Sequence, residues 1–266
     1  SLRVRFGVNG HIGTALPSLL YYGTTNIPHC CPEFTHGQGS VYGIGAIAEK
    51  PLSQSFFLGM RGSFTSVIVD LTQEENTIGL INNSQGNIRF IHSFTATFPG
   101  ISSAALFGWK TTSSLSFATG PGIHIITSPT FSQKESIAQG TPGTFIVGKR
   151  VRNEYSGTLN DAQSLKWEWN IIAAYDLGLD NKRSFFISPE IQYIHSLSNN
   201  VKTNDNSFWH NSSLRGGIAF KYRPHHKPEP VIIPTPPPSI PTPTPPAPIP
   251  PTASINVEII GQDSKS

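Results

Sequence analysis

Charged residues and methionine are scarce in this chain, and long apolar runs are absent from it. Only 13% of the 266 residues are charged and there is a single Met, a composition that is unusual for a soluble helical enzyme. No run approaches about 18 consecutive apolar residues, so the sequence contains no transmembrane helix. The net charge of +3 is spread along the chain. Because no basic stripe is formed, we expect no nucleic-acid partner.

Cysteine is also scarce, and the two cysteines are adjacent, at Cys30 and Cys31. Their spacing fits neither a CxxC redox motif nor a metal site. In an oxidising compartment the pair can form a vicinal disulfide, although its small ring is strained. The alternative is two unbonded small residues in a loop. Neither interpretation includes catalysis, and we expect no metal and no cofactor in this chain.

Aromatic residues and glycine are plentiful, with 16 Phe, 7 Tyr, 4 Trp and 24 Gly, as suits a sheet protein with many turns. Residues 2–12 alternate with a period of two, so that Phe6 and Val8 share one face while Arg3 and Arg5 share the other. This pattern indicates a strand, and its polar face is too charged for the core of a sandwich. Comparable segments recur at residues 40–50, 55–70, 88–109, 115–127, 165–177, 184–195 and 208–223.

These eight segments predict an all-β fold, an eight-stranded antiparallel up-and-down transmembrane β-barrel with lipid outside and a polar lumen. The segment 88–109 is either one long strand or two pieces broken at Pro99-Gly100. Short connections are expected at residues 51–53, 110–114 and 178–183, and long polar ones at 13–39, 71–87, 128–164 and 196–207. Transmembrane barrels alternate long extracellular loops with short periplasmic turns. Both barrel termini are therefore expected in the periplasm.

The predicted barrel occupies residues 1–223 and is followed by an extended proline-rich tail. Residues 224–251 hold 14 of the 23 prolines, and their fixed φ and missing amide donors prevent sheet or helix formation. We expect a periplasmic linker there, either a passive spacer or a peptide that docks on another outer-membrane protein. In the docking case the side-chain anchors are Val231, Ile232, Ile233, Ile240 and Ile249. Residues 252–266 are expected to be the first strand of a periplasmic domain that is truncated or not seen.

Charged residues on the predicted inner face must pair, because an eight-stranded barrel is only wide enough for its side chains to fill. The predicted lumen charge network consists of Arg3, Arg5, Arg61, Arg89, Arg215, Glu49, Glu168 and Glu190. We interpret it as a salt-bridge network that plugs the barrel, and a small gated pore lined by the same residues is the alternative. Trp209, at the outer end of the last strand, is either an interfacial aromatic residue or a platform for a sugar.

The last strand carries the most specific local motif, Arg215-Gly216-Gly217-Ile218-Ala219-Phe220-Lys221-Tyr222. It resembles the signal that the barrel-assembly machinery recognises, with Arg215, Gly217, Phe220 and Tyr222 in the places of that signal. With the barrel and the proline-rich hinge, it makes residues 1–251 resemble the OmpA-like outer-membrane proteins. The resemblance implies a bacterial outer-membrane location and contact with lipid and lipopolysaccharide. It also implies peptidoglycan binding through a C-terminal domain, whose motif no residue here matches.

The sequence shows no constellation typical of catalysis, since G-x-S-x-G, H-E-x-x-H and a glycine-rich phosphate loop are all missing. His92, His124 and His195 are the residues from which a site at the barrel rim could be built, but a lone strand histidine is more often structural. We therefore expect no enzyme activity. The expected function is a structural anchor that links the outer membrane to a periplasmic partner, either alone or within a larger outer-membrane complex. The alternatives are a surface adhesin that uses the long loops and a narrow porin-like channel.

Overall fold

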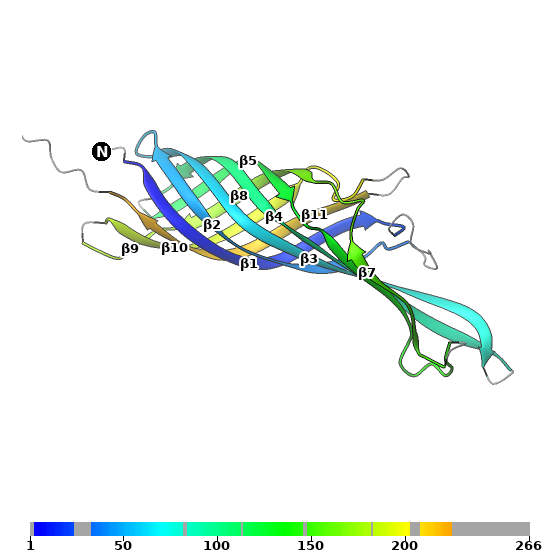
Figure 1. The fold of residues 1–266 in the computed structure, drawn as a ribbon. Helices are drawn as coiled ribbons and strands as arrows, with labels where there is room; N and C mark the ends of the chain where they lie inside the picture. Colours follow the sequence, from blue (N-terminus) through cyan, green and yellow to red (C-terminus); the bar gives the residue numbers. More distant parts are fainter. Residues whose placement is uncertain are drawn as a thin grey trace, which may run out of the picture. The chain divides into compact units, whose positions relative to one another are not determined.

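Period-two alternation produces long antiparallel strands in the computed structural model (Figure 1). The structure describes residues 3–23, 33–81, 84–112, 114–145, 148–181, 183–202 and 208–224. Eleven strands and no helix lie within these ranges, and none of the described residues forms a helix long and apolar enough to cross a membrane. Cys30, Cys31, the five linker anchors and the expected strand at 252–266 lie outside them, so those predictions stay predictions.

Eight of the strands pair in chain order and close into a ring. They are β1 (Arg5–Leu20), β2 (Gly37–Pro51), β3 (Phe56–Ile81), β4 (Ser84–Lys110), β5 (Leu115–Ile126), β8 (Leu165–Tyr175), β10 (Phe185–Ser196) and β11 (Phe208–Tyr222). Each pairs antiparallel with the next, and β11 returns to pair with β1 over its whole length. The prediction of an all-β antiparallel fold is confirmed. A ring of this kind leaves no free edge within the barrel wall.

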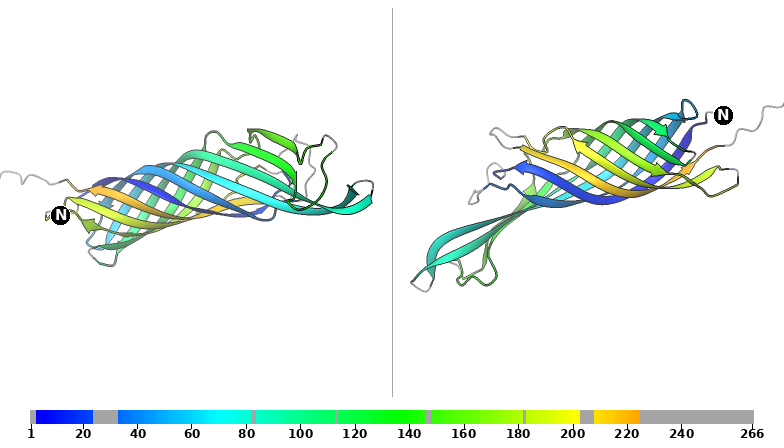
Figure 2. Two further views of the ribbon diagram at one scale, coloured as in Figure 1. Left: turned by 90° about the horizontal axis from the view of Figure 1, so that it is seen from below. Right: turned by 180° about the vertical axis from the view of Figure 1, so that it is seen from behind.

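The two ends of the ring differ. The start of β1 and the end of β11 lie together, since Phe6 pairs with Tyr222, and we call this the terminal end. The short strand β9 (Leu177–Gly178) pairs with β10 near it. At the opposite end the β3–β4 hairpin extends well beyond the other strands, and we call this the hairpin end (Figures 1 and 2).

A four-stranded sheet projects from the hairpin end. Strand β4 pairs with β5 from Gly100 to Lys110, and then with β6 (Thr130–Ile137) from Phe90 to Thr97. Strand β7 (Val151–Thr158) pairs with β6 in turn, so the sheet runs in the order β3, β4, β6, β7. The structure corrects the expected loops 13–39, 71–87 and 128–164, which contain much of this strand structure. The strands continue through these segments, but many of their side chains are polar, so the alternation of apolar and polar residues is weak.

Strand β4 is one continuous strand through Pro99, which settles the choice between one strand and two. The carbonyl of Pro99 accepts a hydrogen bond of 3.0 Å from the backbone N–H of Thr127, so this side of the residue faces the region where β4 changes its partner from β5 to β6. The missing N–H of the proline points to the same side, because both backbone groups of a strand residue face one neighbour. The missing N–H therefore costs no hydrogen bond to β3, which lies on the other side of the residue.

Candidate functional site: the barrel interior

The interior near the terminal end is filled by three cations and three carboxylates. Lys221 Nζ lies 3.0 Å from Glu49 Oε1, 3.1 Å from Asp176 Oδ1 and 3.8 Å from Glu190 Oε1. Arg5 contacts Glu49 at 2.7 Å and Asp176 at 2.5 Å. Arg61 donates two hydrogen bonds to Glu190, of 2.6 and 2.8 Å. We call this set the balanced charge cluster.

Neutral side chains add hydrogen bonds to the balanced charge cluster. Ser188 Oγ donates to Asp176 Oδ1 at 2.6 Å, and Gln192 Nε2 donates to Glu190 Oε2 at 3.1 Å. Carboxylates buried away from water need such partners, since an unpaired one costs several kcal/mol. Each charge of the cluster therefore has an oppositely charged partner, and two of the carboxylates gain a further hydrogen bond.

The structure brings six of the eight predicted network residues into this cluster or around the cavity next to it: Arg5, Arg61, Arg215, Glu49, Glu168 and Glu190. Arg215 is buried in the same interior. Arg3 lies at the end of the barrel, where it donates to the carbonyl of Pro224 at 3.5 Å. Arg89 lies elsewhere, on the projecting part of β4, where its side chain is 48% exposed beside Glu74. The expected barrel strand at residues 88–109 places Arg89 on the inner face, whereas the part of β4 that carries Arg89 lies beyond the barrel.

Two members of the balanced charge cluster, Asp176 and Lys221, are missing from the predicted network. Both lie at inward positions of the alternation, Asp176 in step with Lys166 and Glu168, and Lys221 in step with Arg215. Counting every charged inward residue to the strand ends would therefore have found them. Asp176 stands directly after the last residue of β8, where the alternation gives its weakest signal.

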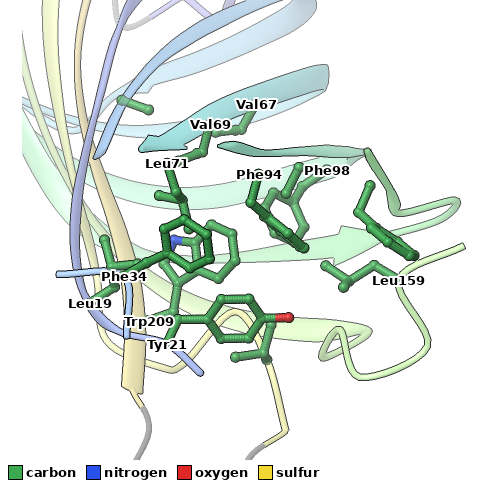
Figure 3. Close-up of a cluster of buried hydrophobic side chains, with 14 of the residues drawn as sticks. Leu19, Tyr21, Phe34, Val67, Val69, Leu71, Phe94, Phe98, Leu159 and Trp209 are labelled. Atoms are coloured by element: carbon green, nitrogen blue, oxygen red, sulfur yellow. The ribbon is translucent and has the colours of Figure 1, made fainter. Parts of the chain in front are cut away.

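An apolar plug fills the interior at the hairpin end (Figure 3). Its members are Ala15, Leu19, Tyr21, Phe34, Val41, Val67, Val69, Leu71, Phe94, Ala96, Phe98, Ile126, Phe131, Leu159, Val201 and Trp209. Trp209 is 0% exposed, and the rings of Tyr21 and Phe98 lie 5.1 and 5.4 Å from its ring. Its indole N–H donates to Asn211 Oδ1 at 2.7 Å. The hypothesis of a sugar platform at Trp209 is wrong, because the ring is covered on all sides.

The barrel wall presents large apolar side chains to the outside on each of the eight ring strands. Examples, one from each strand in chain order, are Ile12, Ile44, Met60, Phe107, Phe117, Ile171, Ile191 and Ile218. At outward positions within the barrel, the charged residues described are Lys50, near the terminal end, and Asp70, near the hairpin end. Apolar surface outside and charge inside is the reverse of the distribution in a soluble protein.

Aromatic residues collect on the outer surface at the terminal end. Phe6 pairs with Tyr222 and Tyr222 pairs with Phe185, while Trp109 pairs with both Phe56 and Phe117. All six side chains are exposed and point outward. Such rings, part apolar and part polar, favour the boundary between lipid and water. Nearer the other end, Trp167 and Trp169 are also exposed on β8.

The four residues of the predicted assembly signal divide between the two faces of β11. Phe220 and Tyr222 are exposed on the outer surface, whereas Arg215 is buried inside. Gly217 lies where β11 approaches β1, and a Cβ there would come within 2.8 Å of the carbonyl oxygen of Gly10. The aromatic pair is thus available to another protein or to lipid, and Gly217 permits close strand packing.

The three strand histidines do not come together in one site. His124 is held by Ser102 at 2.7 Å inside the barrel, His92 contacts Glu75 at 3.0 Å in the projecting sheet, and His195 lies on the outer surface near Ser212. Within the described ranges no group of three or more His, Cys, Asp or Glu is placed to hold a metal ion.

No family model and no curated protein matches this sequence. Solved structures with a similar fold are outer-membrane proteins. The outer membrane protein OprG from Pseudomonas aeruginosa matches with a TM-score of 0.39 and 10% identity, over 84% of this chain and 96% of its own. The outer membrane protease OmpT from Escherichia coli matches with a TM-score of 0.34 and 7% identity, over 83% and 96%.

A third match is Ail, the attachment invasion locus protein of Yersinia pestis, with a TM-score of 0.30 and 8% identity, over 83% of this chain and 99% of its own. All of these TM-scores are below 0.5. These likenesses alone establish no function for this chain.

Proposed function

We propose that this chain is an outer-membrane anchor, a closed barrel embedded in lipid that carries the proline-rich segment on its periplasmic side. The observation that carries the proposal is the inverted distribution of polarity, with exposed apolar side chains on all eight ring strands around a charged interior. A soluble protein rarely exposes more than a few hundred Å² of contiguous apolar surface. A continuous apolar band around a closed ring matches the hydrocarbon layer of a membrane.

A filled interior favours an anchor over a channel. The balanced charge cluster occupies the terminal end and the apolar plug occupies the hairpin end. The two interior cavities described beside the balanced charge cluster have volumes of about 10 and about 30 Å³, room for a few water molecules at most. An ion crossing this barrel would have to break buried ion pairs and pass a dry aromatic cluster.

Conductance in planar bilayers tests this proposal. The refolded chain should insert without stepwise current across the physiological voltage range, while flotation with the lipid shows that insertion took place. Regular single-channel steps from the wild-type chain would favour the narrow channel instead. In the anchor proposal the partner across the periplasm is peptidoglycan, which rests on the OmpA-like resemblance, and the chain has no catalytic role.

A second candidate function, surface binding, is favoured by the projecting sheet. Above Leu71 strand β3 pairs only with β4 among the described strands, and β7 likewise pairs only with β6. The projecting sheet therefore offers two edges of unpaired backbone groups, which extended peptides recognise by adding a strand. In this proposal the sheet binds an extended segment of another protein at the cell surface.

Peptide selection distinguishes peptide binding by the projecting sheet from a purely structural role of that sheet. A phage library of random peptides is selected on the refolded chain and on a variant in which a two-residue turn replaces residues 74–91. Peptides enriched on the wild type alone would support binding at the projecting edge of β3, which the variant lacks. The same peptides from both proteins, or none from either, would contradict binding at this edge. The variant keeps the barrel, so its heat-dependent gel shift serves as the folding control.

A further inference from the structure

Electric charge is unevenly divided inside the barrel. The balanced charge cluster holds three cations and three carboxylates, as described above. The next level toward the hairpin end holds two buried cations, Lys166 and Arg215, and one buried carboxylate, Glu168. Lys166 Nζ lies 4.0 Å from Glu168 Oε1. This level therefore carries an excess of one positive charge, and any proton on His11 or His124, which also face inward, adds to it.

The excess charge is located at Arg215. Its Nε donates to Ser213 Oγ at 2.9 Å, and its Nη1 lies 3.4 Å from His11 Nε2. Among the described residues no carboxylate forms an ion pair with it. Lys166 is better satisfied, because its Nζ also donates to Asn200 Oδ1 at 2.9 Å. Glu168 lines the same cavity as Arg215 but is shared with Lys166, so one of the two positive charges lacks a full counter-charge, which is unfavourable in a buried site.

A cavity of about 30 Å³ adjoins this guanidinium and is lined by polar groups. The polar residues around it include one carboxylate, that of Glu168; they are Asn9, His11, Arg61, Ser63, Ser102, Glu168, Asn170, Gln192 and Arg215. The amide nitrogen of Asn170 and Nδ1 of His11 are buried without a hydrogen-bond partner in the part of the chain that the structure describes. A water molecule needs at least about 10–15 Å³ in the same measure. The space is large enough for a water molecule or a monatomic ion.

We propose that this cavity binds one small monovalent anion of the halide type against Arg215. The anion neutralises the guanidinium, and the amide of Asn170 supplies a neutral donor to it. Enclosure between the balanced charge cluster and the apolar plug makes the anion a structural component that is taken up as the barrel closes. The site is independent of the partner and of the membrane role proposed above.

Refolding in different salts tests the proposal in solution. The full chain is refolded in detergent with sodium chloride, sodium bromide or sodium gluconate at equal ionic strength, and the midpoint of the heat-dependent gel shift is measured. Gluconate is too large for the cavity. The midpoint should be higher in both halides than in gluconate, since a ligand that binds only the folded state stabilises it. In Arg215→Gln the three midpoints should coincide.

Arg89→Gln is the matched control, because it makes the same change on the projecting sheet and should retain the halide dependence of the wild type. Anomalous diffraction from wild-type crystals grown in bromide gives a second readout that needs no variant. A bromide peak beside Arg215 is expected. Equal wild-type midpoints in halide and gluconate, unchanged halide dependence in Arg215→Gln, or a cavity that holds water alone in bromide would each overturn the proposal.

Discussion

The loss of a single charge inside the barrel can destabilise the fold strongly, and among the residues of the balanced charge cluster this applies most to Lys221. Its ammonium group contacts three carboxylates at 3.0, 3.1 and 3.8 Å, which no other side chain of the balanced charge cluster does. Removing one partner from a buried charge group typically costs about 3–5 kcal/mol, because the remaining charges lose compensation. Within the balanced charge cluster, we therefore expect the removal of Lys221 to lower the free energy of unfolding most.

Lys221→Met tests this claim, since methionine keeps most of the volume and removes the charge. The free energy of unfolding in guanidinium chloride should fall by about 3–5 kcal/mol. Lys134→Met is the control, because Lys134 is exposed on the outer side of β6 and its loss should change stability by less than about 0.5 kcal/mol. Equal effects of the two substitutions would contradict the charge cluster as described.

At the residue scale, the sequence predicts which face of a strand a side chain occupies, but not which other side chains surround it. Alternation alone assigns Arg5, Arg61 and Glu190 to the inner face, where the structure places them. Trp209 also occupies an inward position, yet the alternation could not show that Tyr21, Phe94 and Phe98 surround it, since these come from other parts of the chain. Period two reports the face of a strand and says nothing about which layer of the interior a residue reaches.

At the scale of elements, strands β1 and β3 carry two isoleucines that are equally exposed in very different places. Ile12 lies on the barrel wall and Ile78 on the projecting part of β3, and each is 71% exposed. If lipid surrounds the barrel, only Ile12 is in contact with it. A positive charge at the middle of the lipid layer costs about 2–4 kcal/mol in a β-barrel, and the cost falls to about 0–1 kcal/mol near the interfaces.

Ile12→Arg should therefore lower the free energy of unfolding from phospholipid vesicles by about 2–4 kcal/mol. Ile78→Arg makes the identical change at identical exposure and should cost at most a few tenths of a kcal/mol. In detergent micelles the difference should shrink, because micelles adapt around a charge. Two equal and small effects in vesicles would indicate that water surrounds both positions.

Element boundaries could be predicted only where the pattern had two contrasting faces. Segments 115–127, 165–177 and 184–195 agree with β5, β8 and β10 to within two residues. Strands β6 and β7 were missed, since the exposed face of Thr130–Ile137 and nearly all of Val151–Thr158 are polar or small and read as a loop. Strand β6 pairs with β4 beyond the barrel and β7 pairs with β6, and a local pattern reveals neither pairing.

At the scale of the whole molecule, the four tryptophans report on the two environments that the proposal requires. Trp109, Trp167 and Trp169 are exposed on the barrel wall, and Trp209 is enclosed by the apolar plug. The outward side chains gain little from folding in water, because they stay exposed in the folded state. Their apolar character is accounted for only if a non-aqueous phase covers the wall.

Fluorescence quenching by brominated phospholipid measures that contact directly. Four variants, each retaining one tryptophan with the other three replaced by phenylalanine, are refolded into vesicles with brominated acyl chains. Trp109, Trp167 and Trp169 should be quenched relative to unbrominated vesicles, while Trp209 should keep its full emission and a blue-shifted spectrum. Unquenched emission from the three wall residues would contradict a lipid-embedded barrel.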